Sequence, residues 1–225
     1  MDAESALDCR TDYIVLATGS SWTTNGIGRN REMEIEGNTS ENVLSADSLF
    51  VQTSVMPGHY VIYDDDHYYF SSVLALKLIA AGADVSIVCP EGRICSWGAY
   101  TNEQHDNNTQ LYRAGVRVVT DRTVDAVDTA GVTTRCIYTG EQELLAADWF
   151  VPITCRKPDN GLFESITALM SESNFDEPRP KVYAAGDCES PGTIAAAVYA
   201  GYKTALSVVK PDSESAPALR DLPLV

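Results

Sequence analysis

The chain has 225 residues, of which 44% are apolar and 21% charged, as in an ordinary soluble globular protein. Acids number 32 against 16 Lys and Arg, so the formal net charge is −16. Because these acids are spread along the chain, its surface repels phosphate backbones and anionic lipid, and neither nucleic acid nor a membrane is an expected partner.

Other features of the sequence exclude further classes of protein. No stretch approaches the roughly 18–20 apolar residues of a membrane helix, and the first five residues lack the basic and apolar regions of a secretory signal. The six cysteines are scattered without a C-x-x-C pair, which disfavours a disulfide framework and a zinc or iron–sulfur site. The expectation is six reduced thiols in a cytoplasmic protein.

The first half of the chain predicts one strand, a long loop and a strand–helix–strand unit. Residues 12–17 form a β-rich apolar run that ends in a turn, and 20–56 are polar and mostly loop. A breaker, Met56-Pro57-Gly58, indicates a domain crossover. Strands at 59–63 and 84–88 then flank a helix at 70–81, which has the size of a βαβ nucleotide-binding half.

The second half predicts short strands and three more helices. The expected strands lie at 116–119, 124–127, 135–138, 143–146, 149–153 and 181–184. The expected helices lie at 103–114, 161–171 and 191–210, the last with Pro191 near its first position. Residues 211–225 are polar and contain proline, which predicts a loose tail.

This alternation of strands and helices predicts an α/β fold with a largely parallel sheet. The domains expected are a partial domain at 1–56, a second α/β domain at 57–155, a return to the first domain at 156–210 and the tail at 211–225.

Two separate strands end in glycine turns, Ala17-Thr18-Gly19 and Ala185-Gly186-Asp187. Ligands of open α/β sheets bind beyond the carboxyl ends of strands, so both turns are well placed. Gly186 allows close backbone approach, and Asp187 offers a carboxylate to sugar or ribityl hydroxyls. A helix start follows, where N–H groups at 192–194 can face a pyrophosphate. The predicted cofactor-binding residues are Thr18, Gly19, Gly186, Asp187, Thr193 and Ile194; no residue is predicted to be catalytic or to bind a metal.

These motifs resemble one branch of flavoproteins with two dinucleotide-binding domains. The segments that carry the resemblance are 13–22 with 26–29, 61–70 (VIYDDDHYYF), 96–104 (SWGAYTNEQ) and 182–201 (VYAAGDCESPGTIAAAVYAG). They are similar to the C-terminal half of trimethylamine dehydrogenase and its relatives, which include dimethylamine and histamine dehydrogenases, N-methylproline demethylases and 2,4-dienoyl-CoA reductase. The resemblance implies a glutathione-reductase-like NAD(P)-type domain plus the incomplete remainder of an FAD-type domain.

The resemblance also shows what this sequence lacks. Full-length relatives begin with a TIM barrel that holds FMN, followed by a cysteine cluster for a [4Fe–4S] centre and a βαβ with G-x-G-x-x-G that seats FAD or ADP. None of these is present, so the chain is a subunit of a split enzyme, a fragment or a diverged stand-alone domain. FAD or ADP would bind at the two turns once a partner completes the site.

The strand–helix turn at 64–70 (DDDHYYF) departs from the NAD(P)-binding pattern. It has no glycine to let backbone N–H groups reach a pyrophosphate, and its three acids repel phosphate. NAD(P) is therefore not expected here. A divalent cation on three consecutive acids is disfavoured, since consecutive side chains at a strand end point in different directions. The favoured interpretation is a solvated acidic turn with Asp66 capping the next helix.

Three functions remain open. The first is the nucleotide-domain portion of a trimethylamine-dehydrogenase-like flavin oxidoreductase, inactive alone, whose complete form acts on amines or N-methyl compounds. Its implied partners are a barrel-containing FMN and iron–sulfur subunit and an electron-transfer flavoprotein. The second is a non-enzymatic scaffold or interaction module, and the third is an NAD(P)H-dependent reductase.

A domain without its first βαβ leaves sheet surface uncovered, which predicts self-association or a partner over the strands at 12–17 and 182–184.

Overall fold

The computed structural model describes residues 1–172 and 179–209. The chain divides into two compact units: Met1–Ser21 with Arg156–Val225 form unit 1, and Trp22–Cys155 form unit 2. The sequence placed a crossover at 56–58, whereas this division assigns residues 22–56 to unit 2. The reason is burial, because Ala46 and Leu49 are 0% and 1% exposed within the core of unit 2.

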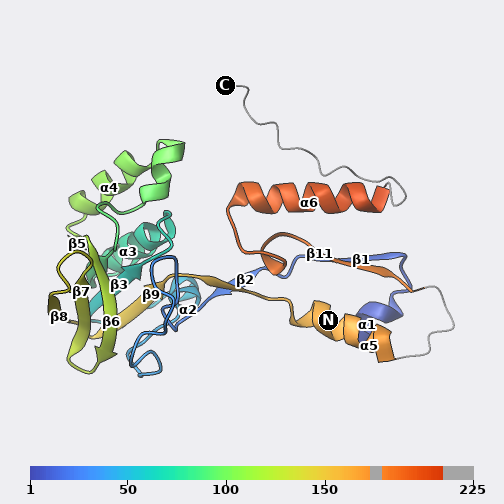
Figure 1. Ribbon diagram of the computed structural model, residues 1–225, viewed down its shortest axis with the longest axis horizontal. Helices are drawn as coiled ribbons and strands as arrows, with labels where there is room; N and C mark the ends of the chain where they lie inside the picture. Colours follow the sequence, from blue (N-terminus) through green and yellow to red (C-terminus); the bar gives the residue numbers. More distant parts are fainter. Residues whose placement is uncertain (173–178, 210–225) are drawn as a thin grey trace. The chain divides into compact units, whose positions relative to one another are not determined.

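Unit 2 is built on a four-stranded parallel sheet in the order β5-β4-β3-β9 (Figure 1). Its strands are β3 (His59–Asp64), β4 (Asp84–Val88), β5 (Arg117–Val119) and β9 (Trp149–Ile153). Helix α3 (Phe70–Ala80) connects β3 to β4 as the predicted βαβ unit. The other helical segments of unit 2 are α2 (Ala46–Val51), α4 (Gln104–Arg113) and the 3-10 segment η1 (Ser96–Thr101).

A second, antiparallel sheet completes unit 2. It consists of β6 (Arg122–Asp128), β7 (Gly131–Cys136) and β8 (Gln142–Ala146). Tyr63 and Phe150 of the parallel sheet pack with Val124 and Val132 of the antiparallel sheet in one buried cluster, while Leu74 of α3 lies in another cluster with Ile87 of β4 and Leu111 of α4. The parallel sheet is thus covered on both faces, as strands of this type require.

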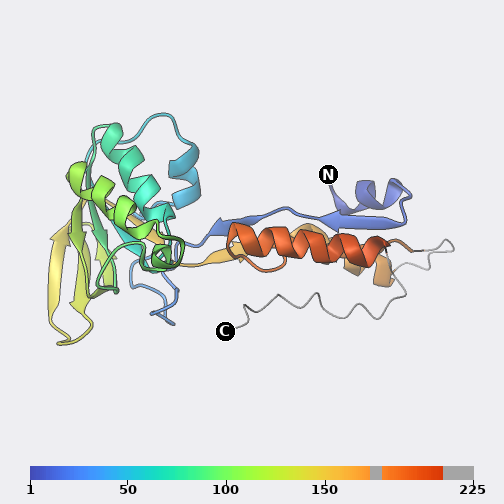
Figure 2. The same ribbon diagram turned by 90° about the horizontal axis from the view of Figure 1, so that it is seen from above.

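Unit 1 contains a two-stranded parallel sheet of β1 (Tyr13–Leu16) and β11 (Lys181–Ala184). Helices α1 (Ala3–Asp8) and α5 (Gly161–Glu172) pack on one side of it through Ala6, Leu16 and Ile166, and α6 (Ile194–Val209) lies on the other side (Figures 1 and 2). The 3-10 turn η2 (Gly186–Cys188) links β11 to α6. A further strand pair joins β2 (Ser20–Trp22) with β10 (Arg156–Pro158).

The predicted α/β class with parallel strands is confirmed, and every predicted strand and helix has a counterpart in the structure. The sequence missed α1, β2, α2, η1 and β10, each of which has six residues or fewer. Pro191 is not at the first helical position, because α6 starts at Ile194. The predicted tail at 211–225 lies outside the described residues. Within the part of the chain that is described, no helix is long and apolar enough to span a membrane.

Candidate functional site

The two glycine turns of unit 1 lie at the carboxyl ends of adjacent parallel strands. Leu16 pairs with Ala184, and the Ala185 N–H donates to the Leu16 carbonyl at 2.9 Å. The chain then turns at Gly19 with φ +87° and at Gly186 with φ +68°, a backbone region that glycine enters without strain. The fold therefore brings two motifs about 170 residues apart in sequence to one edge of the sheet, as ligand sites of α/β folds require.

The Thr18-Gly19 turn is tied to the segment that leads into α5. The Thr18 hydroxyl donates to the Asp159 carbonyl, and the Asp159 N–H donates to the Gly19 carbonyl at 2.9 Å. A Cβ built on Gly19 would meet no atom within 4 Å, so open space adjoins this turn.

Asp187 is held in a polar cluster that the sequence did not predict. Its Oδ2 accepts from the Ser20 hydroxyl at 3.1 Å and from the Arg156 guanidinium, and its Oδ1 accepts from the Gly192 N–H at 3.0 Å. These three donors use most of the roughly four acceptor positions of a carboxylate, which leaves about one on Oδ1 for a ligand hydroxyl. Arg156 is the residue that sequence reasoning missed; a single arginine in a polar loop carried no signal.

The start of α6 differs in part from the prediction. The Gly192 N–H is occupied by Asp187 and does not face outward as an anion donor. Thr193 caps the helix, since its hydroxyl accepts from the Ala196 N–H at 3.3 Å. Ile194 is 73% exposed. Gly186 lies close to this helix, with a built Cβ 3.7 Å from the Ala197 Cβ. All six predicted residues thus belong to unit 1, and cofactor binding by them stays a prediction.

In unit 2 the corresponding position is the carboxyl end of β3, beside β9, where the strand order reverses. Here the expectation of a solvated acidic turn is wrong. Asp64 and Asp65 are 0% exposed and His67 is 2% exposed. The N–H groups of Asp65 and Asp66 donate to the Ile153 carbonyl at 2.9 and 3.1 Å, which pulls the turn inward onto the end of β9. Asp66 does not cap α3, whose N-cap position is Tyr69.

The loop at 26–31 supplies hydrogen-bond donors to the buried Asp65 carboxylate, whereas Asp64 accepts from the His67 backbone N–H at 3.0 Å. The Asn30 amide Nδ2 donates to Asp65 at 2.8 Å, and the Asn30 backbone N–H lies 3.0 and 3.2 Å from the two Asp65 oxygens. His67 Nε2 lies 3.2 Å from the same Asp65 Oδ1 and 2.8 Å from the Asn30 amide Nδ2. Gly28 packs so closely that a Cβ on it would sit 2.2 Å from Asp65 Oδ2. The chain itself therefore fills the crevice that a dinucleotide would need.

Two titrating groups in this crevice are shifted by their surroundings. Burial raises the pKa of the Asp64 carboxyl from 3.8 to about 6, although His67 opposes the change. Burial lowers the pKa of His67, but the hydrogen bond to Asp65 and the charge of Asp64 outweigh it, so the net shift is upward. His67 also has φ +65°, an uncommon conformation for a non-glycine residue that the surrounding contacts hold in place. Asp64 and Asp65 are both too deeply buried to contact a substrate.

Among the described residues, no group of three or more His, Cys, Asp or Glu side chains is placed to hold a metal ion. Of the three consecutive acids at 64–66, Asp64 accepts a hydrogen bond from the His67 backbone N–H and Asp65 accepts from Asn30.

Comparison with known proteins identifies related dehydrogenases. No family model matches the chain. Dimethylamine dehydrogenase of Hyphomicrobium sp. (strain x) is 24% identical over 95% of this chain and 32% of its own length. Histamine dehydrogenase of Rhizobium sp. 4-9 matches with a TM-score of 0.88 and 29% identity over 96% of this chain and 34% of its own. The 6-hydroxypseudooxynicotine amine oxidase HisD of Pseudomonas geniculata N1 matches with a TM-score of 0.83 and 26% identity, over 90% and 30%.

The chain therefore spans about a third of the length of each of these three proteins. More distant structures share the fold alone, among them a flavoprotein disulfide reductase of Escherichia coli at 16% identity and a TM-score of 0.57. Both the amine-oxidising relatives and the wider fold correspond to the resemblance that the motifs at 61–70 and 182–201 indicated.

Proposed function

We propose that the chain is the nucleotide-domain portion of a trimethylamine-dehydrogenase-like flavin-dependent oxidoreductase that acts on amines or N-methyl compounds, because it is similar to dimethylamine and histamine dehydrogenases over nearly its whole length. The observation that carries this proposal is the match of nearly the whole chain to about a third of amine-oxidising relatives. The chemistry on the amine would then take place in the part of the complete enzyme that corresponds to the other two thirds of these relatives, where FMN and an iron–sulfur centre are expected.

The residues of unit 1 fit a flavin or adenine dinucleotide at the two glycine turns. Open space adjoins Gly19, and Asp187 keeps acceptor capacity for a ribose or ribityl hydroxyl. Arg156 holds the Asp187 carboxylate in one position, which limits the entropy lost when a hydroxyl binds. Thr18, Thr193 and Ile194 line the same edge in this proposal. The cofactor, FAD or ADP, would supply electron transfer or structural anchoring; the chain would supply one wall of its site.

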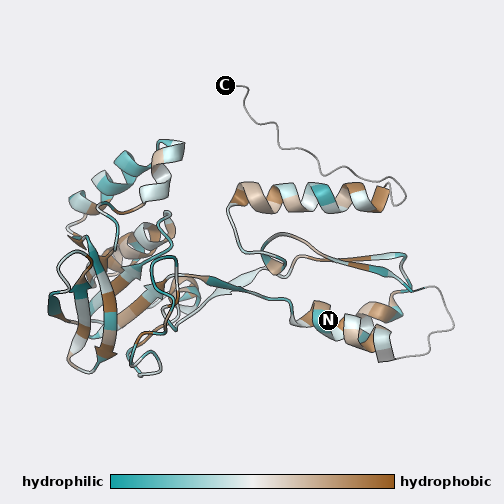
Figure 3. Cartoon of the chain, in the orientation of Figure 1, coloured by the Kyte–Doolittle hydropathy of each residue, from teal (hydrophilic) through white to brown (hydrophobic). Residues whose placement is uncertain are grey.

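Completion of this wall requires further polypeptide, which we place on a partner chain. A parallel sheet of only two strands is marginal by itself, and parallel sheets are normally buried on both faces. Helix α6 has no buried residue in the structure, although several of its residues are hydrophobic (Figure 3). Val15 of β1 is 49% exposed and Val198 of α6 is 67% exposed. The partner is the barrel-containing FMN and iron–sulfur subunit, with a second copy of this chain as the alternative.

This proposal makes the chain non-catalytic alone. Asp64, Asp65 and His67 of unit 2 are 0%, 0% and 2% exposed, so none of these acid–base groups can reach a substrate. The complete assembly would pass electrons through the iron–sulfur centre to an electron-transfer flavoprotein. Purified alone, the chain should therefore fail to oxidise amines with a dye acceptor, and amine oxidation without an added partner would contradict the proposal.

The decisive experiment is the visible absorption spectrum of the chain purified together with its natural neighbours. A flavin spectrum that stays with the complex after gel filtration, and is lost in Asp187→Ala, supports the site at the two turns. Asp84→Ala, which removes an exposed carboxylate from unit 2, is the matched control and should keep the spectrum. A colourless complex, or equal loss in both variants, would refute it.

One observation favours the second candidate, a scaffold that binds no nucleotide. The crevice of unit 2 is filled by Asn30, Asp65 and His67, so this half of the fold keeps its shape without room for a dinucleotide. The same observation weighs against the NAD(P)H-dependent reductase. Titration with NADPH should give no saturable binding, and saturation at micromolar concentration would revive that third function.

A further inference from the structure

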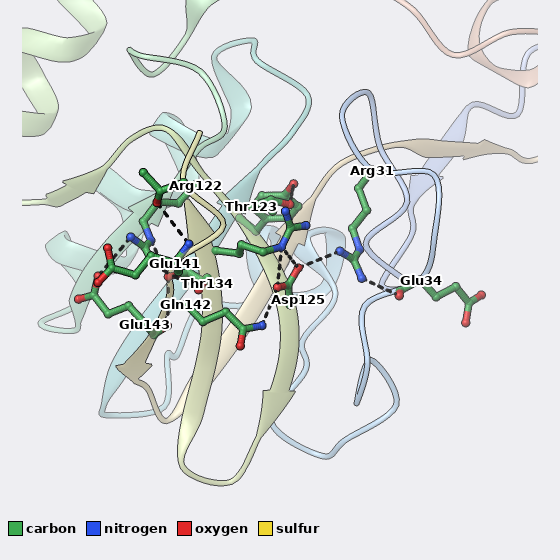
Figure 4. A network of polar contacts seen from close by, with 12 residues as sticks. Arg31, Glu34, Arg122, Thr123, Asp125, Thr134, Glu141, Gln142 and Glu143 are labelled. Carbon is green, nitrogen blue, oxygen red and sulfur yellow. Dashed lines mark hydrogen bonds and ion pairs between the residues drawn. The ribbon is translucent and has the colours of Figure 1, made fainter. Parts of the chain in front are cut away.

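Most cationic side chains of unit 2 have a polar partner within the unit. The unit contains eight Lys and Arg residues. Arg31 and Arg135 share Asp125, at 3.4 and 2.9 Å, while Arg117 and Arg122 share Glu143, at 3.9 and 3.6 Å. Figure 4 shows Arg31 beside Asp125, and Arg122 beside Glu143. Of the other four, Arg29 pairs with Asp66 at 3.7 Å, and the Lys77 ammonium donates to three backbone carbonyls.

The remaining two arginines, Arg93 and Arg113, form no ion pair or hydrogen bond with any side chain or backbone group in the described ranges. Both line the same groove, whose volume is about 520 Å³. The other lining residues are Gln104, His105, Asn108, Thr109 and Tyr112, so no carboxylate faces this groove. The chain has a net charge of −16, so two neighbouring arginines without an acidic partner are unusual in it. No contact within the fold accounts for their position.

The two walls of the groove are joined by hydrogen bonds. One wall is a single face of α4, and the other is the segment around Arg93. The Asn108 amide Nδ2 donates to the carbonyls of Ile94 and Gln104, each at 2.8 Å, and so ties the two walls together. Ile94 and Leu111 are 0% exposed beneath it. The two guanidinium groups are thus presented from anchored segments.

We propose that this groove binds a small phosphate-bearing ligand with a planar apolar body. Guanidinium groups bind phosphate and carboxylate in a bidentate manner, and two of them without internal partners lose no existing contact when they do so. The Tyr112 ring is 66% exposed and offers a flat surface for stacking. The volume lies within the range of about 300–1,000 Å³ of small-molecule sites. This site lies within unit 2 and does not depend on the proposed function of unit 1.

The test is titration of the full chain with phenyl phosphate at low ionic strength, followed by amide chemical shifts. Saturable shifts should centre on residues 93 and 104–113, and inorganic phosphate should bind more weakly because it lacks the ring. Each of Arg93→Gln and Arg113→Gln should weaken binding about tenfold or more, as expected for loss of a charged hydrogen bond. Tyr112→Ala should weaken phenyl phosphate but leave inorganic phosphate unchanged.

Arg117→Gln is the matched control, because it removes the same charge from an exposed arginine of unit 2 outside the groove. It should bind phenyl phosphate as the unmodified chain does. Three outcomes would overturn the proposal: no saturation, retained affinity in the double variant of Arg93 and Arg113, or equal loss in Arg117→Gln. An acidic peptide that binds the groove and is not displaced by phenyl phosphate would also overturn it, in favour of a protein partner.

Discussion

Replacing Asp64 by Asn should make unit 2 more stable at pH 8 and not at pH 4. Burial of the Asp64 carboxyl raises its pKa from 3.8 in the unfolded chain to about 6 in the folded chain. The folded state therefore prefers the neutral acid, whereas the unfolded state ionises freely above pH 4. The stability that the neutral acid provides is complete below pH 3.8 and is lost as the pH rises through 6.

The magnitude follows from the size of this shift. A shift of about two units at about 1.4 kcal/mol per unit gives about 3 kcal/mol lost between pH 4 and pH 8. The backbone N–H of His67 donates to Asp64 Oδ1 at 3.0 Å, and an Asn side chain keeps this acceptor oxygen. Asn also carries no charge that burial would desolvate. It gives up the attraction between Asp64 and a protonated His67, so the expected net gain at pH 8 is about 1–3 kcal/mol.

The assay is urea unfolding monitored by tryptophan fluorescence at pH 4, 6 and 8. The difference in unfolding free energy between Asp64→Asn and the unmodified chain should grow with pH and level off above pH 7. Asp84→Asn, at an exposed position on the same unit, is the control for a simple change of net charge and should show a smaller, flatter difference. A pH-independent difference for Asp64→Asn would refute the reasoning.

Three other predictions concern the same two units. Asp65→Asn should destabilise unit 2 by about 3–5 kcal/mol in urea unfolding, because it leaves the buried His67 without its charged partner; a loss below 1 kcal/mol would argue that the pair is dispensable. Gly28→Ala should cost about 1–3 kcal/mol, since its Cβ would meet Asp65, whereas Gly161→Ala, with open space around it, should change stability little. Val198→Ser on α6 should weaken self-association or partner binding about tenfold by analytical ultracentrifugation, and unchanged association would place the interface elsewhere.

The sequence was most informative where one element sufficed to fix the structure. The helix at 70–81 and the strands at 84–88 and 149–153 were found within a residue of their predicted bounds, because their apolar pattern and flanking glycine act locally. The pairing of β1 with β11 could be anticipated only from matching turns, since about 165 residues separate the strands. The family motif at 182–201 supplied that link.

The errors have a common physical cause. Three consecutive acids indicate a solvated turn unless a distant residue compensates for burial, and for Asp65 that residue is Asn30 in a polar loop. Likewise, Asp187 could be placed at a ligand site from its turn, but its ion pair with Arg156 depends on a strand pair that no local pattern predicts. Long-range polar contacts of this kind leave no periodic trace in a single sequence.

The two ends of unit 2 meet. The Thr23 N–H and hydroxyl both donate to the Cys155 carbonyl, at 3.1 and 3.2 Å, so the chain enters and leaves the unit at one closed point. A module with joined ends can be inserted into, or removed from, a host loop without strain on either. Residues 22–155 should consequently fold as an independent cassette, and they are a natural place for circular permutation or for transplanting the groove beside α4 into another scaffold.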